Sequence, residues 1–188
     1  MTGGIQVRPL RREDGELLDA VMAGMSAQSR YQRYHGPKPR LTSADRRYLT
    51  NVDGRDHIGL VALAPDGAPI AVARYVRLKD DPAAAELGVE VVDAWQGQGL
   101  GLDLITRLAR RAAAGGIERL VARVLDASRL KDGLKRRGWR AIERDGASVV
   151  LVADAWAVAR SAPARARPRR ERVPAPGVPM PRPAAGRW

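Results

Sequence analysis

Two carboxylates in one apolar stretch are the side chains of this sequence best suited to proton transfer. Residues 85–92 are mostly apolar, have the length of a β-strand, and include Glu86 and Glu90. Because side chains alternate between the two faces of a strand, Glu86, Gly88 and Glu90 share one face. A carboxylate in a partly apolar cleft can serve as a general base. Either glutamate is a candidate, and the alternative is that both are solvated charges at a sheet edge.

A turn with three glycines follows this strand. Residues 96–101 read Gln-Gly-Gln-Gly-Leu-Gly and lead into residues 100–114, where apolar positions recur at helical spacing. The first backbone amides of a helix have no partner within it, and the helix dipole adds partial positive charge there. Because the glycines carry no side chains, a diphosphate can approach these amides closely. The turn is therefore a candidate phosphate-binding site.

Two common phosphate-binding motifs do not fit this turn. A P-loop ends in Gly-Lys followed by Ser or Thr, and no such ending is present. The dinucleotide-binding motif G-x-G-x-x-G follows a strand directly. Here Gly101 comes one residue early, and the polar residues 93–95 separate strand and turn. A plain glycine-rich turn without a ligand remains the alternative.

Strands and helices must alternate around these groups. Strand–helix–strand units require parallel pairing, whereas hairpin turns at 65–67 and 145–146 require antiparallel pairing. We therefore expect an α/β fold with a central mixed sheet and helices on both faces. The predicted strands are 5–10, 57–64, 69–78, 85–92, 119–125, 139–144 and 147–153, and the predicted helices are 13–25, 29–34, 42–51, 100–114 and 128–137.

The composition predicts one folded domain followed by a basic tail. From residue 157 onward, 32 residues contain seven prolines and eight arginines against one glutamate. So little of this segment is apolar that we expect a disordered tail, 157–188, after a folded domain, 1–156. More than half of the formal net charge of +12 belongs to the tail. Since Trp188 is its one aromatic residue, base stacking and nucleic-acid binding are not expected.

Several classes of site are excluded by composition. The absence of cysteine excludes disulfides and thiolate chemistry. The two histidines, His35 and His57, give no basis for a multi-histidine site, so we expect no metal cofactor. No apolar run reaches the roughly 20 residues that cross a bilayer, and the N-terminus has no signal-peptide pattern. We expect a cytoplasmic protein, and the oligomeric state is not indicated.

The glycine-rich turn resembles the acetyl-CoA-binding signature of the GNAT N-acetyltransferases. Gln96, Gly99 and Gly101 match the family's Q/R-x-x-G-x-G/A pattern. The resemblance extends over residues 5–153 and includes the Gly-Trp pair at 138–139, where the family usually has Gly-Phe or Gly-Tyr. It implies the GNAT fold, acetyl-CoA as cosubstrate, and acetyl transfer to a primary amine.

A narrower resemblance, to the catalytic domain of bacterial Pat-type protein lysine acetyltransferases, singles out Glu86. It rests on Ser-Arg-Tyr-Gln-Arg-Tyr at 29–34, Ala-Arg-Tyr at 73–75 and Ala-Glu at 85–86. It implies that Glu86 is the general base, with Glu90 as the second candidate. Pat-type enzymes commonly carry a cyclic-nucleotide-binding or acyl-CoA-synthetase-like domain, and we expect neither in these 188 residues.

The family resemblance also implies contacts to acetyl-CoA. A backbone N–H in the stretch Val91–Val92 is implied to stabilise the oxyanion. Ser128 stands where relatives usually have an asparagine that contacts CoA, and it either bonds the pantetheine or caps a helix. The helix at 128–137 lacks the tyrosine that many relatives use to protonate the leaving thiolate. The implied cofactor-binding residues are Val91, Val92, Gln96, Gly97, Gln98, Gly99, Leu100, Gly101 and Ser128.

Three functions remain open from the sequence. The acceptor is either a protein lysine or a small-molecule amine, or the fold binds CoA or a partner without turnover. The missing tyrosine and asparagine motivate the last possibility. The arginines and tyrosines at 30–34 either line the acceptor site or form a solvated helix face with core tyrosines, and we expect the latter.

Overall fold

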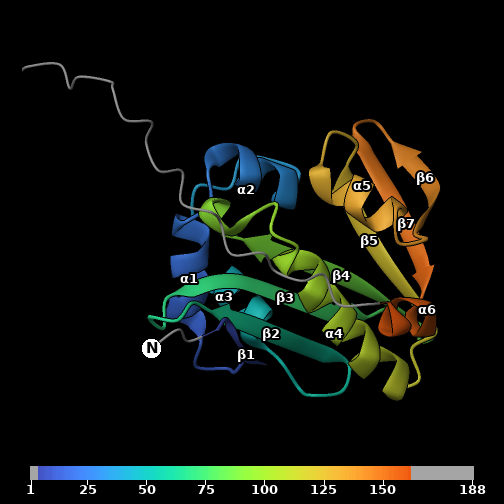
Figure 1. The fold of residues 1–188 in the computed structure, drawn as a ribbon, viewed down its shortest axis with the longest axis horizontal. Helices are drawn as coiled ribbons and strands as arrows, with labels where there is room; N and C mark the ends of the chain where they lie inside the picture. The colour runs from blue at the N-terminus through green and yellow to red at the C-terminus, as the bar shows by residue number, and fades with distance from the viewer. Residues whose placement is uncertain (1–3, 162–188) are drawn as a thin grey trace, which may run out of the picture.

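A seven-stranded mixed sheet forms the centre of the protein. The computed structural model describes residues 4–161 (Figure 1). Across the sheet the strand order is β1-β2-β3-β4-β5-β7-β6, and all neighbours are antiparallel except β4 and β5. The strands are β1 (Gln6–Pro9), β2 (His57–Leu63), β3 (Pro69–Arg77), β4 (Ala84–Val91), β5 (Arg119–Leu125), β6 (Arg140–Asp145) and β7 (Ser148–Asp154).

Helices cover both faces of this sheet. They are α1 (Gly15–Ala23), α2 (Ala27–Tyr34), α3 (Ser43–Thr50), α4 (Leu100–Ala114), α5 (Arg129–Lys135) and α6 (Ala155–Arg160), with a 3-10 turn η1 (Asp93–Trp95). Apolar side chains of α1 and α3 pack on one face around Val61 and Val72, whereas α4, α5 and α6 pack on the other around Tyr75 and Leu120. Among the described residues, no helix is long and apolar enough to cross a membrane.

Helix α4 forms where the periodicity predicts it. Leu104, Ile105, Leu108 and Ala112 lie on one side of the helix, and all four are buried against the sheet. The helix ends at Gly115, whose backbone N–H bonds carbonyls of the last turn. This packing fixes the N-terminus of α4 at the end of β4.

The pairing of β4 with β5 stops halfway along both strands. The parallel register runs only from Ala84–Arg119 to Glu86–Val121, although β4 continues to Val91 and β5 to Leu125. In Figure 1 the two halves of the sheet meet near α6 and diverge toward α2 and α5. The edge of β4 beyond Glu86 is therefore not covered by a neighbouring strand.

The structure confirms the predicted fold class and corrects the predicted domain boundary. A mixed sheet with helices on both faces is present, as expected. The boundary after residue 156 is wrong, because α6 continues to Arg160 and buries Val158 and Ala159. The first residues of the predicted tail thus belong to the core. The remainder, 162–188, lies outside the described residues.

Helix α6 should contribute measurably to the stability of the folded domain. A chain ending at Trp156 should be less stable than one ending at Ser161 by about 2 kcal/mol, the value of burying one aliphatic side chain such as Val158. Urea unfolding of the two truncated proteins measures the difference. Equal stabilities would show that α6 does not contribute to the core in solution.

Candidate functional site

The glycine-rich turn presents a row of free backbone amides. Gly97 and Gly99 have φ angles of 73° and 84°, in the left-handed region that favours glycine. Within the described chain, the amides of residues 97–102 donate no hydrogen bond. They lie at the N-terminus of the 15-residue helix α4, where the helix dipole favours a negative group. The turn therefore has the geometry of an anion site built from backbone.

The two glutamine side chains are hydrogen-bonded within the protein, and contact of either with a cofactor stays a prediction. The Nε2 atom of Gln96 lies 2.9 Å from the carbonyl oxygen of Val91, 2.9 Å from Asp93 Oδ1 and 3.2 Å from Ser29 Oγ. Gln98 Nε2 donates to the carbonyl oxygen of Ala94 in η1 at 3.0 Å. Gln96 thus ties the turn to β4 and α2. Both residues shape the site, and the amides of the turn are what it offers to an anion.

Only one of the two predicted valines has an available amide. Val92 N–H donates to the carbonyl oxygen of Ile70 at 2.9 Å. Because amides alternate in direction along an antiparallel strand, the N–H of Val91 points away from β3 and toward β5. Pairing with β5 has already ended there. Val91 can therefore donate to a group in the open stretch, whereas the amide of Val92 is already used within the sheet.

Ser128 caps helix α5. Its side chain accepts a hydrogen bond from Leu130 N–H at 3.2 Å. This confirms the helix-cap alternative, while the hydroxyl proton remains free to donate to a ligand. Contact of Ser128 with a cofactor stays a prediction. Helix α5 itself contains no tyrosine.

The two glutamates of β4 have different surroundings. Glu86 is exposed and forms no hydrogen bond or ion pair with any residue that the structure describes. Glu90 is buried, with 6% of its surface exposed. Its Oε1 atom lies 2.8 Å from Arg33 Nε and accepts a hydrogen bond from the Tyr34 hydroxyl at 3.4 Å. Glu86 is therefore the carboxylate of this strand that is free to accept a proton.

The guanidinium of Arg33 lies directly on Gly88, between the two glutamates. A Cβ atom at position 88 would collide with Arg33 Nη2 and lie 3.0 Å from Cζ. Burial opposes the charge of Arg33, but Glu90, Tyr34 and Glu86 together raise its pKa above the ordinary value. Glycine at position 88 thus makes room for a partly buried, permanently charged side chain.

A second arginine borders the same cluster from β3. Burial lowers the pKa of Arg74, with Glu90 opposing and Arg33 adding to the shift. Its Cζ atom lies 5.5 Å from the ring centroid of Tyr48 on α3. Glu90 is therefore paired with Arg33, while its charge only opposes the lowering of the Arg74 pKa from a distance.

Helix α2 departs from the solvated face that the sequence predicts. The expected core position is wrong for Tyr31, which is 50% exposed. The expected solvated position is wrong for Arg33, whose side chain is 22% exposed and paired with Glu90. One signal was available in the sequence: Gly88, between two glutamates on one strand face, leaves a space that another side chain must fill. The sequence does not say which.

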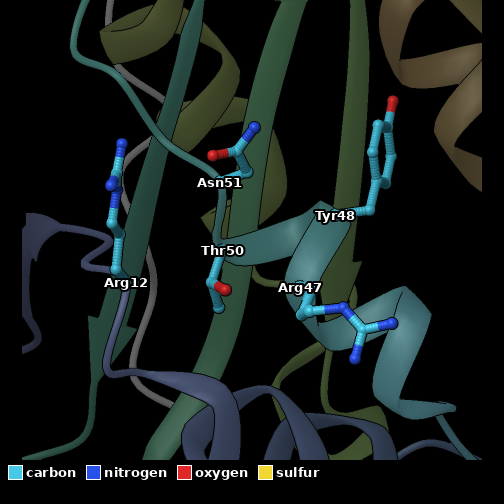
Figure 2. A pocket seen from close by; sticks show the side chains of 5 residues that line it. All are labelled: Arg12, Arg47, Tyr48, Thr50 and Asn51. Atoms are coloured by element: carbon cyan, nitrogen blue, oxygen red, sulfur yellow. The ribbon is translucent and has the colours of Figure 1, made fainter.

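A surface pocket of about 420 Å³ lies elsewhere, around the end of α3 (Figure 2). It is lined by Arg12, Arg47, Tyr48, Thr50 and Asn51. The labelled side chains extend in different directions, and Arg47 points away from Arg12 and Asn51. The polar groups do not converge on one point. Despite its size, this pocket is therefore a weaker candidate for the functional site than the glycine-rich turn and β4.

The sequence is similar to those of known acetyltransferases. The model of the Acetyltransferase (GNAT) family matches residues 22–131. Acetyltransferase Pat of Mycolicibacterium smegmatis (strain ATCC 700084 / mc(2)155) is 32% identical over 120 residues, which are 63% of this chain and 36% of that protein. The match thus spans little more than a third of that relative's length.

Two solved structures extend the comparison to three dimensions. The GNAT domain of S. lividans PAT is 32% identical with a TM-score of 0.74, over 80% of this chain and 90% of that one. The cAMP-binding acyltransferase from Mycobacterium smegmatis is 28% identical with a TM-score of 0.55, over 80% of this chain and 43% of that one. Since the family match also covers more than half of the sequence, the chain belongs to the GNAT acetyltransferase family.

Proposed function

We propose that the protein is an N-acetyltransferase that moves the acetyl group of acetyl-CoA to a primary amine. The observation that carries the proposal is the row of free amides at 97–102 beside the unpaired edge of β4. A diphosphate suits the amides at the start of α4. The pantetheine arm, an extended chain with its own amide groups, suits an open strand edge. Acetyl-CoA contains a diphosphate followed by a pantetheine arm, so it matches both features.

The reaction is a direct attack of the amine on the thioester. The nitrogen bonds to the carbonyl carbon, the C–S bond breaks, and CoA leaves as a thiolate. The N–H of Val91 supports the carbonyl oxygen as it becomes negative. The amine must be neutral, and a lysine amine has a reference pKa of about 10.4. Glu86 accepts its proton as general base.

Two kinds of acceptor amine are compatible with this reaction. The resemblance to Pat-type enzymes favours a protein lysine, and a small-molecule amine is the alternative. Glu86 is exposed on β4, so the base can be reached by an amine on a protein surface. An acceptor screen should therefore start with folded proteins and then include polyamines.

Binding of CoA without turnover is the second candidate. It is favoured by the absence of tyrosine from α5 and by serine at position 128, where relatives usually have an asparagine. Tight binding of acetyl-CoA with no acetylated product from any acceptor would support it over the enzyme.

Calorimetric titration with acetyl-CoA tests the site directly. The parent protein should bind one equivalent, and Gly99→Val should weaken binding by about tenfold or more. Valine at a φ of 84° is strained by about 1–2 kcal/mol, and its side chain stands where the diphosphate approaches the amides.

The matched control is Gly67→Val. Gly67 has a φ of 86° in the turn between β2 and β3, so the strain is similar but the turn is not the proposed site. Its binding should equal that of the parent. Equal losses in both variants would reflect general strain, and no binding by the parent would contradict the proposed function.

A further inference from the structure

One face of β4 carries two carboxylates with a cation seated between them. Glu86, Gly88 and Glu90 point to the same side, with residues two apart separated by about 7 Å along the strand. The guanidinium of Arg33 rests on Gly88. The Arg33 guanidinium is near both carboxylates, and the negative charge of each raises the pKa of Arg33.

The structure shows which carboxylate holds the arginine. Arg33 Nε lies 2.8 Å from Glu90 Oε1, whereas Glu86 forms no ion pair with any described residue. Glu90 is buried and is also bonded by the Tyr34 hydroxyl on α2, so its carboxylate is fixed in place. A fixed, buried carboxylate competes well for a guanidinium, because the exposed alternative is screened by solvent.

The other charged side chains that border this cluster are cations. Arg74 faces it from β3, with burial lowering its pKa. Lys38 lies 5.7 Å from the ring of Tyr34, and its own partner is Asp45 at 2.7 Å. Arg123 on β5 alternates onto the same face of the sheet as Glu86 and is exposed. On the described residues, the negative partners within this cluster are thus the two glutamates of β4.

We propose that Glu90 is a positioning residue that holds the Arg33 guanidinium on Gly88 and thereby keeps it from pairing with Glu86. The inference rests on the proposed function, in which Glu86 is the base. Without Glu90, Arg33 turns to the next carboxylate on the same face. An ion pair with arginine favours the ionised form of a carboxylate, so Glu86 becomes a weaker base.

Carbon-13 NMR titration of the Glu86 side-chain carboxyl tests the proposal without any acceptor. In Glu90→Gln, this carboxyl should titrate about one pH unit or more below the parent. In Arg33→Gln it should titrate at or above the parent. The double variant Arg33→Gln/Glu90→Gln should follow Arg33→Gln, because no guanidinium is left to move. An unchanged Glu86 titration in folded Glu90→Gln overturns the proposal.

Kinetics give a second readout that a merely structural role would not produce. In Glu90→Gln, kcat should fall by about tenfold, and the acid limb of its pH dependence should move to lower pH. Adding Arg33→Gln should restore both. A loss that the double variant does not restore would instead mark Glu90 as a structural residue or as the base itself, and either result overturns the proposal.

Two further measurements apply if Glu90→Gln does not fold or if the parent protein is inactive. If Glu90→Gln does not fold, Glu90→Asp can replace it, because aspartate withdraws the carboxylate by one methylene. In this variant the pH at which Glu86 titrates should fall by less than the shift expected for Glu90→Gln. If the parent transfers no acetyl group, the proposed function fails, while the NMR titrations still decide where Arg33 lies.

Discussion

Replacing Glu86 by glutamine is expected to lower kcat for acetyl transfer by roughly 10²- to 10⁴-fold, the usual contribution of a general base. Glutamine keeps the shape of the side chain but does not accept the amine proton. Glu86 is exposed and makes no ion pair with the described residues, so folding and acetyl-CoA affinity should not change. Steady-state rates at saturating acetyl-CoA, together with calorimetric titration, measure the two effects separately.

The loss in Glu86→Gln should depend on the acceptor. An α-amine, with a reference pKa of about 7.7–8.0, is partly neutral near pH 8 and needs the base less than a lysine amine does. The matched control is Glu143→Gln on β6, another exposed glutamate, whose rate should equal that of the parent. A Glu86→Gln protein as active as the parent would remove Glu86 from the mechanism.

Local sequence patterns predicted the turn and α4 well, because both follow from neighbouring residues. The stripe of apolar residues sets the helix, and the glycines at 97 and 99 permit the left-handed turn before it. Helix α6 was missed for the opposite reason. Its residues look like the start of the tail, and they are helical because Val158 and Ala159 pack against α4, where Arg110 Nε donates to the Ala159 carbonyl at 3.0 Å. Tertiary packing here overrides composition.

In the candidate site, too, local patterns were predicted and long-range contacts were missed. Strand alternation placed Glu86 and Glu90 on one face, which the structure confirms in the register of β4. It did not reveal which carboxylate is free. That depends on Arg33, which comes from a helix far earlier in the chain and reaches Glu90 only when α2 docks on the sheet. A contact of this kind leaves no periodic signal in the sequence.

Replacing Arg33 by methionine is expected to lower the free energy of unfolding by about 3 kcal/mol at neutral pH. Removing one partner of a buried ion pair costs about 3–5 kcal/mol, because the remaining charge is left buried. Glu90 is 6% exposed. The expected value is at the lower end because Arg74 still lies nearby on β3 and the Tyr34 hydroxyl still donates to Glu90.

The loss in Arg33→Met should shrink in acid. Burial without the charge of Arg33 favours the protonated carboxyl of Glu90 in the folded variant, whereas a glutamate in the unfolded chain has a pKa of about 4.3. The folded variant therefore binds the proton more tightly. The stability this gives is fully present below the unfolded value and is lost as pH rises from there through the folded value. Urea unfolding at pH 4 and pH 7 should show the larger deficit, relative to the parent, at pH 7.

Arg107→Met separates burial from ion pairing as the cause. Arg107 Nε lies 2.8 Å from Asp103, the same separation as in the Arg33–Glu90 pair, but the Arg107 side chain is 48% exposed. Asp103, although 13% exposed, lies in the first turn of α4, where the helix dipole stabilises its charge without Arg107. A pair one helical turn apart is worth about 0.3–0.5 kcal/mol, so this variant should lose little at either pH. Arg33→Met/Glu90→Leu should regain most of the stability, because no charge is then left unpaired at position 90. If Arg33→Met costs no more than Arg107→Met, the carboxylate of Glu90 is hydrated in solution, and the cluster on β4 is open rather than closed by Arg33.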